Sequence, residues 1–218
     1  MDIIGQLRSS GVHLWNNRSD ANGSALTNTD AYRQAKAHIE AILLIELGAR
    51  SPLVCRLTKL PRATVKQLYR RIHGRPSPAG QGPFTDAWYL QNGEHMLHAN
   101  IVWRLNEALE GLKREPSERL INLYEMYVIT VDEPLLDVAH VELVPRLLKA
   151  GIWLTHSCAS CGDYYVSPVT DIENVCPACA MQHLYRCPDC NSALKPHEVG
   201  RRVEHCPQCG KRLHHLAT

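Results

Sequence analysis

The first sustained apolar pattern in the chain lies just ahead of Gly48, which is suited to end a helix. Thr29 or Asp30 can cap the start of that helix. Its apolar stripe consists of Ile39, Ile42, Leu43, Ile45 and Leu47. The preceding residues, above all those from Asn16 to Asn28, are rich in Gly, Ser, Asn and Asp without periodicity. We therefore predict a flexible tail over residues 1–29 and then a helix to about Leu47.

Two shorter helical segments follow, separated by a turn. Ser51-Pro-Leu-Val-Cys-Arg-Leu predicts a short helix with Ser51 as its cap and a proline in its first turn. After a turn through Thr58-Lys-Leu-Pro, a second helix is predicted from about Pro61 to Ile72, ended by Gly74. Two short helices joined by a tight turn are typical of a helix-turn-helix unit.

The second of these helices has two distinct faces. Its apolar face, which spans about 100° and is predicted to pack on the core, holds Val65, Leu68, Tyr69 and Ile72. A basic stripe on another face occupies the place where a recognition helix carries its DNA contacts. We predict DNA contacts from Arg62, Lys66, Gln67, Arg70 and Arg71. The alternative is a solvated amphipathic helix whose outer face happens to be basic.

Residues 74–85 carry so many prolines and glycines that they cannot be helical. Beyond them, helical periodicity returns, and helices are predicted over residues 93–112, 117–131 and 134–150. Pro134 suits the first turn of the last helix, and Pro145 is predicted to kink or split it. The predicted fold class is therefore mainly α, with a helical domain over 30–150 that contains the helix-turn-helix-like unit.

Charge is unevenly distributed along the chain. The net charge is only +2, yet no acidic residue falls between Glu46 and Asp86. That window contains eight basic residues: Arg50, Arg56, Lys59, Arg62, Lys66, Arg70, Arg71 and Arg75. A long window of one sign predicts an anionic partner, and nucleic acid is the commonest. Residues 86–150 are net acidic, which indicates either an ordinary solvated surface or a face for a basic partner or polymerase.

Eight of the nine cysteines form Cys-x-x-Cys pairs within the last 61 residues. The pairs are Cys158/Cys161, Cys176/Cys179, Cys187/Cys190 and Cys206/Cys209. Each pair is predicted to form a tight backbone knuckle, and two facing knuckles supply the four thiolates of a tetrahedral Zn²⁺ site. The intervals of 14 and 15 residues within each half are close to zinc-site spacing. Directly after the second cysteine, Gly162, Asn191 and Gly210 tolerate the left-handed conformation that such a knuckle demands, and Ala180 departs from this pattern. We predict two structural Zn²⁺ ions per chain, in a first zinc module over 151–182 and a second zinc ribbon over 183–218.

Disulfides and a redox or catalytic role are the alternatives to structural zinc. Disulfides are disfavoured because residues 1–18 lack the pattern of a secretory signal, so we expect a reducing compartment. A redox or catalytic role is less favoured, since four thiolates leave no open metal position. The pairs could also join in an interleaved order. Histidines near enough to replace a thiolate are His156, His183, His205, His214 and His215.

Several blocks of the chain, in order, are similar to one known protein family. They are Ile45-Glu-Leu-Gly-Ala-Arg50, Val65-Lys-Gln-Leu-Tyr69, Gly74-Arg-Pro-Ser-Pro-Ala-Gly80 leading into Pro83-Phe-Thr-Asp-Ala-Trp88, Glu133-Pro-Leu-Leu136, Ser157-Cys-Ala-Ser-Cys-Gly162 and Cys176-x-x-Cys179. On these blocks, which span residues 33–180, the chain resembles the flagellar transcriptional activator FlhC. Members of that family are the C subunit of the FlhDC master regulator.

The resemblance implies a cytoplasmic, mainly helical DNA-binding activator that is not an enzyme. It also implies a hetero-oligomer with a small helical D-type subunit, which binds promoter DNA and helps to recruit RNA polymerase. The family's four zinc ligands map onto Cys158, Cys161, Cys176 and Cys179, whereas the later cysteines and residues 1–29 are additions. Two alternatives stay open: a divergent paralogue that regulates non-flagellar genes alone, and a zinc-ribbon scaffold that binds proteins.

An enzyme is the least supported interpretation, because no nucleophile elbow or phosphate-binding loop is present in the sequence. Glu94, His95 and His98 could suggest a metal or acid–base cluster, but no third ligand accompanies the two histidines. They are predicted to be packed or surface residues.

Overall fold

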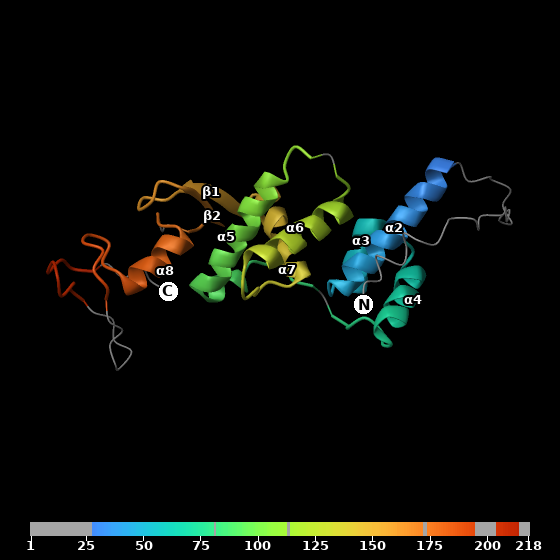
Figure 1. The fold of residues 1–218 in the computed structure, drawn as a ribbon, viewed down its shortest axis with the longest axis horizontal. Helices are drawn as coiled ribbons and strands as arrows, with labels where there is room; N and C mark the ends of the chain where they lie inside the picture. The colour runs from blue at the N-terminus through green and yellow to red at the C-terminus, as the bar shows by residue number, and fades with distance from the viewer. Residues whose placement is uncertain (1–27, 81, 113, 172–173, 195–203, 214–218) are drawn as a thin grey trace. The chain divides into compact units, whose positions relative to one another are not determined.

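Helices make up most of the computed structural model (Figure 1), which describes residues 28–80, 82–112, 114–171, 174–194 and 204–213. In chain order the elements are α2 (Asn28–Glu46), α3 (Ser51–Thr58), α4 (Arg62–His73), the 3₁₀ helix η1 (Tyr89–Gln91), α5 (Gly93–Ala108), α6 (Pro116–Thr130), α7 (Val138–Lys149), β1 (Trp153–Ser157), β2 (Tyr164–Pro168) and α8 (Pro177–Tyr185). The mainly α class is confirmed. Of the predicted tail over residues 1–29, the structure describes only Asn28 and Thr29, and both lie in α2.

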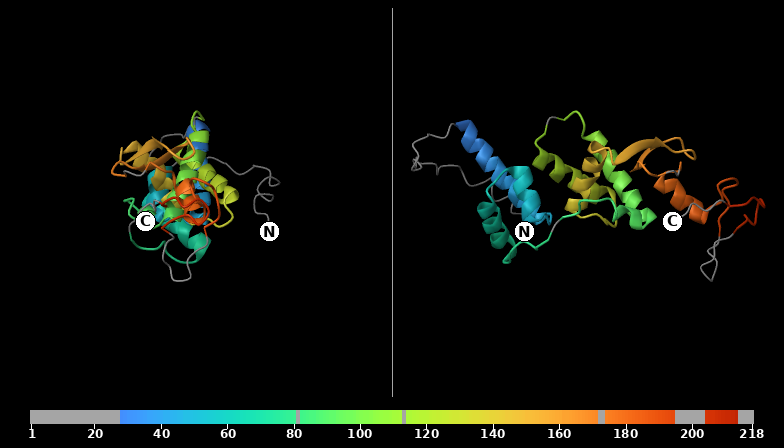
Figure 2. Two further views of the ribbon diagram at one scale, coloured as in Figure 1. Left: turned by 90° about the vertical axis from the view of Figure 1, so that its left-hand side faces the viewer. Right: turned by 180° about the vertical axis from the view of Figure 1, so that it is seen from behind.

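The described residues from Ala37 onward belong to one compact unit, and all packing described below lies within it. Its main core includes the junction where α5 packs against α6 and α7 (Figure 2), and it also takes in buried residues of α2, α3 and α4. Burial of large apolar side chains, each contributing about 1.5–3 kcal/mol, holds these helices together. The largest fully buried side chains include Trp153, Tyr89, Tyr127, Leu44, Ile45 and Leu123.

The helices α3 and α4 follow the predicted positions, and three residues join them. α4 ends where predicted, at Gly74, whose φ of +67° is a conformation that glycine adopts without a steric penalty. The prediction that Ser51 caps α3 is wrong, because Ser51 is already helical and buried. Its backbone N–H instead donates to Ser77 Oγ at 3.0 Å. The Pro-rich linker therefore supplies the hydrogen bond that a local cap would have provided.

The last predicted helix, over 134–150, begins later than expected. α7 starts at Val138, because Asp137 is its N-cap and accepts hydrogen bonds from the backbone N–H groups of Ala139 and His140. Pro134 therefore lies in the preceding loop, and its predicted place in the first turn is wrong. Pro145 lies inside α7, which continues through it to Lys149 as one helix, so the helix is not split.

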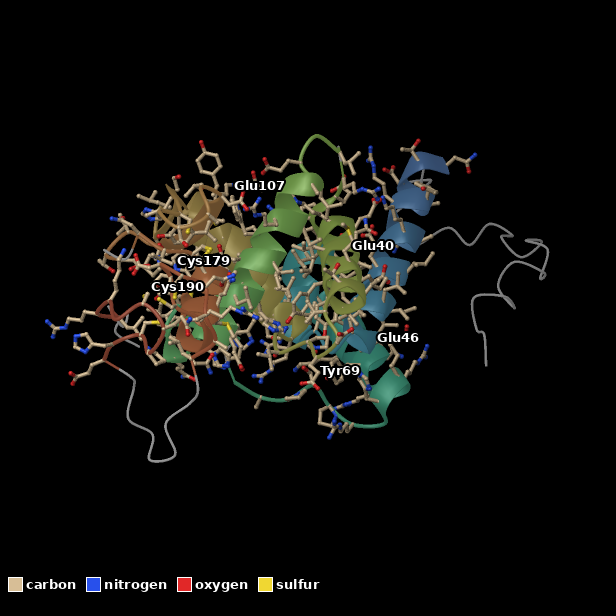
Figure 3. All side chains as sticks on the ribbon, turned by 60° about the vertical axis from the view of Figure 1, so that its left-hand side comes forward. Glu40, Glu46, Tyr69, Glu107, Cys179 and Cys190 are labelled. Atoms are coloured by element: carbon tan, nitrogen blue, oxygen red, sulfur yellow. The ribbon has the colours of Figure 1, made fainter. Side chains whose placement is uncertain are left out.

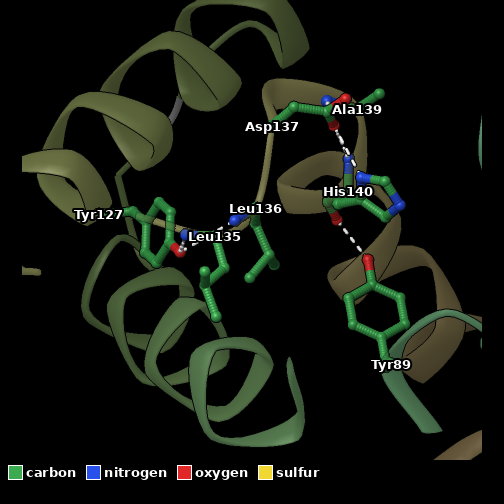
Figure 4. A network of polar contacts seen from close by, with 7 residues as sticks. All are labelled: Tyr89, Tyr127, Leu135, Leu136, Asp137, Ala139 and His140. Atoms are coloured by element: carbon green, nitrogen blue, oxygen red, sulfur yellow. Dashed lines mark hydrogen bonds and ion pairs between the residues drawn. The ribbon is translucent and has the colours of Figure 1, made fainter. Parts of the chain in front are cut away.

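A tyrosine fixes the loop between α6 and α7 (Figure 4). The hydroxyl oxygen of Tyr127 accepts hydrogen bonds from the backbone N–H groups of Leu135 and Leu136, at 3.0 and 3.1 Å. The same hydroxyl lies 2.5 Å from Nδ1 of the buried His98. With two donors already facing it, the hydroxyl gives its own proton to Nδ1, so His98 is neutral in the folded protein. Burial lowers the pKa of His98, in agreement with that assignment.

This arrangement predicts that stability falls on acidification. A histidine with a lowered pKa in the folded state binds fewer protons there than in the unfolded chain, whose value is about 6.5. The contribution of His98 is therefore fully present above about pH 6.5 and is lost as the pH falls below it. We expect His98→Gln to reduce the difference in the free energy of unfolding between pH 7.5 and pH 5.5, as measured by urea titration. An unchanged difference contradicts the assignment.

Candidate metal centres and a candidate nucleic-acid interface

The structure gathers the eight paired cysteines into two groups that follow sequence order. Cys158, Cys161, Cys176 and Cys179 form the first group, and in each group the four sulfur atoms lie within 4.8 Å of one another. The second group consists of Cys187, Cys190, Cys206 and Cys209. The sulfur atoms of both groups lie in the C-terminal part of the chain in Figure 3, where Cys179 and Cys190 are labelled. This grouping matches the sequential arrangement rather than the interleaved one.

The first group joins two unlike halves. Cys158 and Cys161 lie in a tight knuckle between β1 and β2, in which the Cys158 N–H donates to Asp163 O and the Gly162 N–H to Cys158 O, both at 2.8 Å. Gly162 has a φ of +79°, which confirms the left-handed conformation predicted after the second cysteine.

The other half of the first group is the start of a helix and not a knuckle. Cys176 is the N-cap of α8, and its sulfur accepts a hydrogen bond from the Cys179 N–H at 3.4 Å. Because Cys179 is itself helical, Ala180 needs no left-handed conformation, which explains why it departs from the glycine and asparagine at the other three pairs. The expectation of two facing knuckles is therefore wrong for this group. The helix start does not by itself ionise this pair, because burial raises the pKa of both Cys176 and Cys179.

The second group consists of two knuckles with matching sequences, Cys187-Pro-Asp-Cys-Asn-Ser-Ala-Leu194 and Cys206-Pro-Gln-Cys-Gly-Lys-Arg-Leu213. In each, the N–H of the first cysteine donates five residues ahead, to Ser192 O or Lys211 O, at 2.9 Å. Asn191 and Gly210 occupy the same left-handed position, with φ of +55° and +72°. Leu194 and Leu213 are buried together with Cys187 and Cys206 in a small cluster of their own, while Cys190 and Cys209 are exposed.

The sulfur separations fit a four-coordinate metal ion and not disulfides. A tetrahedron with metal–sulfur bonds of about 2.3 Å has sulfur–sulfur edges of about 3.8 Å. The separation is 3.9 Å between Cys161 and Cys176. In the second group it is 3.7 Å between Cys187 and Cys209 and 3.6 Å between Cys190 and Cys206. A disulfide bond is about 2.05 Å long, and all nine cysteines are free.

One cysteine in each group is poised to be a thiolate near neutral pH. Burial opposes ionisation of Cys158, but hydrogen bonds from the backbone N–H groups of Cys176, Cys161 and Ser160 outweigh it and lower the pKa to about 6. A hydrogen bond from the Ser192 hydroxyl, assisted by backbone N–H groups, lowers the pKa of Cys206 to about 6. Thiolates are the form in which cysteine binds metal, so both donor sets suit a soft divalent cation.

Histidines do not join the cysteine groups within the described residues. The ring of His156 packs on Tyr165, and His205 is exposed. The candidates His214 and His215 lie outside the described residues, and the side chain of His183 does as well. The suggested pair His95 and His98 also separates, because His95 stacks on Trp88 with ring centres 3.7 Å apart while His98 contacts Tyr127.

The hairpin that carries the first knuckle is attached to α5 by an asparagine that sequence reasoning missed. Asn100 Oδ1 accepts a hydrogen bond from the Val166 N–H at 2.7 Å, and Asn100 Nδ2 donates to Val166 O at 3.0 Å. Trp153 of β1 and Val166 of β2 belong to the main helical core. An isolated asparagine within a helical pattern gives no sequence signal of such a pairing.

Removing the Asn100 amide is expected to destabilise the protein markedly. Asn100→Leu leaves both backbone groups of the fully buried Val166 without partners, at a cost of about 1–3 kcal/mol for each group. Arg104→Ala is the matched control, because Arg104 also donates to this strand, at Tyr164 O, but from an exposed position. Urea unfolding should show a loss several times larger for Asn100→Leu, and equal losses would contradict the role given to the amide.

The predicted basic face of α4 is exposed to solvent. Arg62, Lys66, Gln67, Arg70 and Arg71 are all exposed, whereas Tyr69, labelled in Figure 3, and Val65 are buried on another face of the helix. Within the described parts of the chain these four basic residues have no ion-pair partner. Arg56 differs, because it forms an ion pair with Glu142 of α7 at 2.9 Å. Arg56 is thus held in an ion pair, whereas the four basic residues of the α4 face are unpaired among the described residues.

Comparison with protein families matches residues 27–191 to the family described as flagellar transcriptional activator (FlhC). This match covers about three-quarters of the chain. The chain belongs to the FlhC family. It is therefore related to transcriptional regulators and not to enzymes. Within the described residues no helix is long and apolar enough to cross a membrane.

Individual relatives agree with this membership. The chain is 26% identical over 148 residues to the flagellar transcriptional regulator FlhC of Enterobacter cloacae, an alignment that covers 64% of this chain and 77% of that protein. It is 29% identical over 145 residues to FlhC of Verminephrobacter eiseniae, covering 64% and 78%. It is 28% identical over 146 residues to FlhC of Paraburkholderia atlantica, an alignment that covers 64% of this chain and 67% of that protein.

The FlhC match divides the two cysteine groups. It includes all of the first group but ends at residue 191, after Cys190 and before Cys206 and Cys209. The second group is therefore completed only by residues beyond the part of the chain that the family match covers.

Proposed function

We propose that this FlhC-family chain is the DNA-binding subunit of a transcriptional activator that works in a hetero-oligomer with a D-type subunit. The single observation that carries the proposal is the exposed, unpaired basic face of α4 in a chain whose family match spans that helix. The site of action is the cytoplasm, where promoter DNA and RNA polymerase are found.

In this proposal α3 and α4 act as a helix-turn-helix-like unit. α4 enters the major groove, with Arg62, Lys66 and Gln67 nearest the base edges and with Arg70 and Arg71 on phosphates. Two features support this: α3 and α4 pack closely together, and α4 keeps its basic face free of acidic partners. The net acidic segment over residues 86–150 is then the candidate contact for RNA polymerase.

We further propose that each cysteine group holds one structural Zn²⁺, two per chain. Four thiolates saturate a tetrahedral ion and leave no position for a substrate, so the metal's contribution is cross-linking. In the first group the residues that would hold the ion come from the β1–β2 knuckle and the start of α8. In the second group they come from two knuckles. Among the described residues these share a small apolar cluster, the Lys211–Asp189 ion pair at 2.7 Å and a contact between Ser192 Oγ and Cys206 Sγ at 3.2 Å, so we expect most of their cohesion to come from the ion.

The metal proposal predicts two zinc ions per chain by native mass spectrometry. A Cys206→Ser, Cys209→Ser double variant is expected to carry one, because two thiolates cannot hold the ion at the second group. A single zinc in the wild-type protein contradicts the assignment of that group.

The activator proposal is tested with the full chain co-expressed with the D-type subunit of its own organism. We expect a stable complex that binds a fragment from upstream of flagellar genes at least about tenfold more tightly than a scrambled fragment. A complex without DNA preference would favour a protein-binding scaffold. Specific DNA binding by this chain without a complex would favour a paralogue that acts alone. Both alternatives are tested because Cys206 and Cys209 lie beyond the residues that the family match covers.

A further inference from the structure

A shallow hollow of about 270 Å³ lies where α7 meets the start of the β-hairpin. Its floor is apolar, and two of its seven lining residues are basic. The lining residues are Phe84, Leu143, Arg146, Leu147, Lys149, Ala150 and Ile152. The hollow therefore joins the Pro-rich linker, a helix and the hairpin at one surface.

Exposed apolar side chains extend this hollow along the hairpin. The Val169 N–H donates to Ile152 O, which places these two residues opposite each other, and Leu154 follows Ile152 on the same side of its strand. Ile152 and Leu154 are each 44% exposed, and Val169 is 56% exposed. Phe84 is the only phenylalanine in the sequence, yet it is 70% exposed beside the hollow and not in the core. A contiguous apolar surface with such a rim is typical of a protein-binding site.

The charge beside this surface is positive. Lys149 is exposed and has no ion-pair partner among the described residues, while Arg146 pairs with Glu142 at 3.3 Å and remains half exposed. Two copies of this chain that met through this surface in a symmetric dimer would bring these like charges together, which disfavours self-association. An occupant with acidic residues beside its apolar ones would be complementary.

We infer that this surface, the hairpin face (Phe84, Ile152, Leu154, Val169, Arg146 and Lys149), docks an amphipathic helix of the D-type subunit that carries acidic residues beside its apolar stripe. The inference rests on the proposed function, which supplies a helical protein partner. Phe84 and Ile152 contact the apolar side of that helix, and Lys149 pairs with a carboxylate at its margin. A helix laid into a groove is a common mode of protein recognition.

The test compares three single variants of the full chain, each co-expressed with the D-type subunit. Phe84→Glu and Lys149→Glu alter the hairpin face at exposed positions, where substitution is expected to leave the fold intact. Ile129→Glu is the matched control, because Ile129 is 85% exposed on α6 and lines no part of the hollow. Isothermal titration calorimetry gives the affinity for the D-type subunit, and the urea midpoint and metal content verify folding.

We expect Phe84→Glu and Lys149→Glu to weaken binding of the D-type subunit at least tenfold, with Ile129→Glu unchanged. Wild-type affinity in both hairpin-face variants overturns the inference while the hetero-oligomer itself stands. Failure of the wild-type chain to bind the D-type subunit overturns the hetero-oligomer and the inference together. Equal weakening in all three variants also counts against the hairpin face, because the control then behaves as part of the interface.

Discussion

Reversing the charges of Lys66 and Arg70 is expected to weaken promoter binding by at least about 100-fold near 100 mM salt. Both side chains are exposed on α4 and have no ion-pair partner among the described residues, so their charge is available to phosphates. Each phosphate contact removed also makes the dependence of log K on log salt less steep by about one. The double variant Lys66→Glu, Arg70→Glu should therefore lose affinity and have a salt dependence less steep by about two.

The control for this effect is a single charge reversal elsewhere, half the size of the change in the double variant. Arg114→Glu changes the net charge as much as Lys66→Glu does, but Arg114 pairs with Glu118 at 2.6 Å ahead of α6. We expect little change in DNA affinity from that variant. Fluorescence anisotropy over a range of salt concentrations measures both quantities, and zinc content should stay constant throughout. Wild-type affinity in the double variant would exclude the α4 face as the DNA contact.

Cys158→Ser is expected to destabilise the whole helical unit, whereas Cys206→Ser should leave it nearly unchanged. The ion proposed for the first group ties the β1–β2 knuckle to α8, and β1 and β2 contribute Trp153 and Val166 to the main core. Structural zinc supplies about 10 kcal/mol or more of folding free energy in small modules. Loss of that ion should therefore lower the free energy of unfolding of the unit by about 5 kcal/mol or more.

The second group gives the contrast, because its buried cluster contains only its own cysteines and two leucines among the described residues. Each cysteine variant should lose one zinc ion per chain, but only Cys158→Ser should shift the urea midpoint of the helical unit. Cys55→Ser serves as the neutral comparison, since Cys55 belongs to neither group. Equal shifts for Cys158→Ser and Cys206→Ser would mean that the second group supports the helices as well.

Patterns that depend on neighbours in sequence were predicted well. The helix α4, its end at Gly74 and its basic outer face all follow from the spacing of apolar and charged residues. The left-handed residues after the cysteine pairs were foreseen at Gly162, Asn191 and Gly210, because a tight knuckle has one steric solution. The sequential grouping of the cysteines is confirmed, although the spacing of the pairs also allowed the interleaved one.

Features that depend on contacts distant in sequence were not predicted. Ser77 bonds to the start of α3 from 26 residues away, so the local serine was wrongly chosen as the cap. α7 starts after Asp137 and not at Pro134, because the Asp137 carboxylate accepts hydrogen bonds from two backbone N–H groups of the first turn. The helical setting of Cys179 was also missed, since a Cys-x-x-Cys pair looks the same in a knuckle and at a helix start.

The pairing of Asn100 with Val166 has a consequence for how the protein behaves at high concentration. A two-stranded sheet has free edges whose backbone groups can recruit a strand from another molecule. Here the side-chain amide of Asn100 bonds to both backbone groups of Val166, in the middle of β2, as a neighbouring strand would. A helix side chain thus blocks the edge of a short sheet. Loss of that amide should therefore lower solubility in addition to stability.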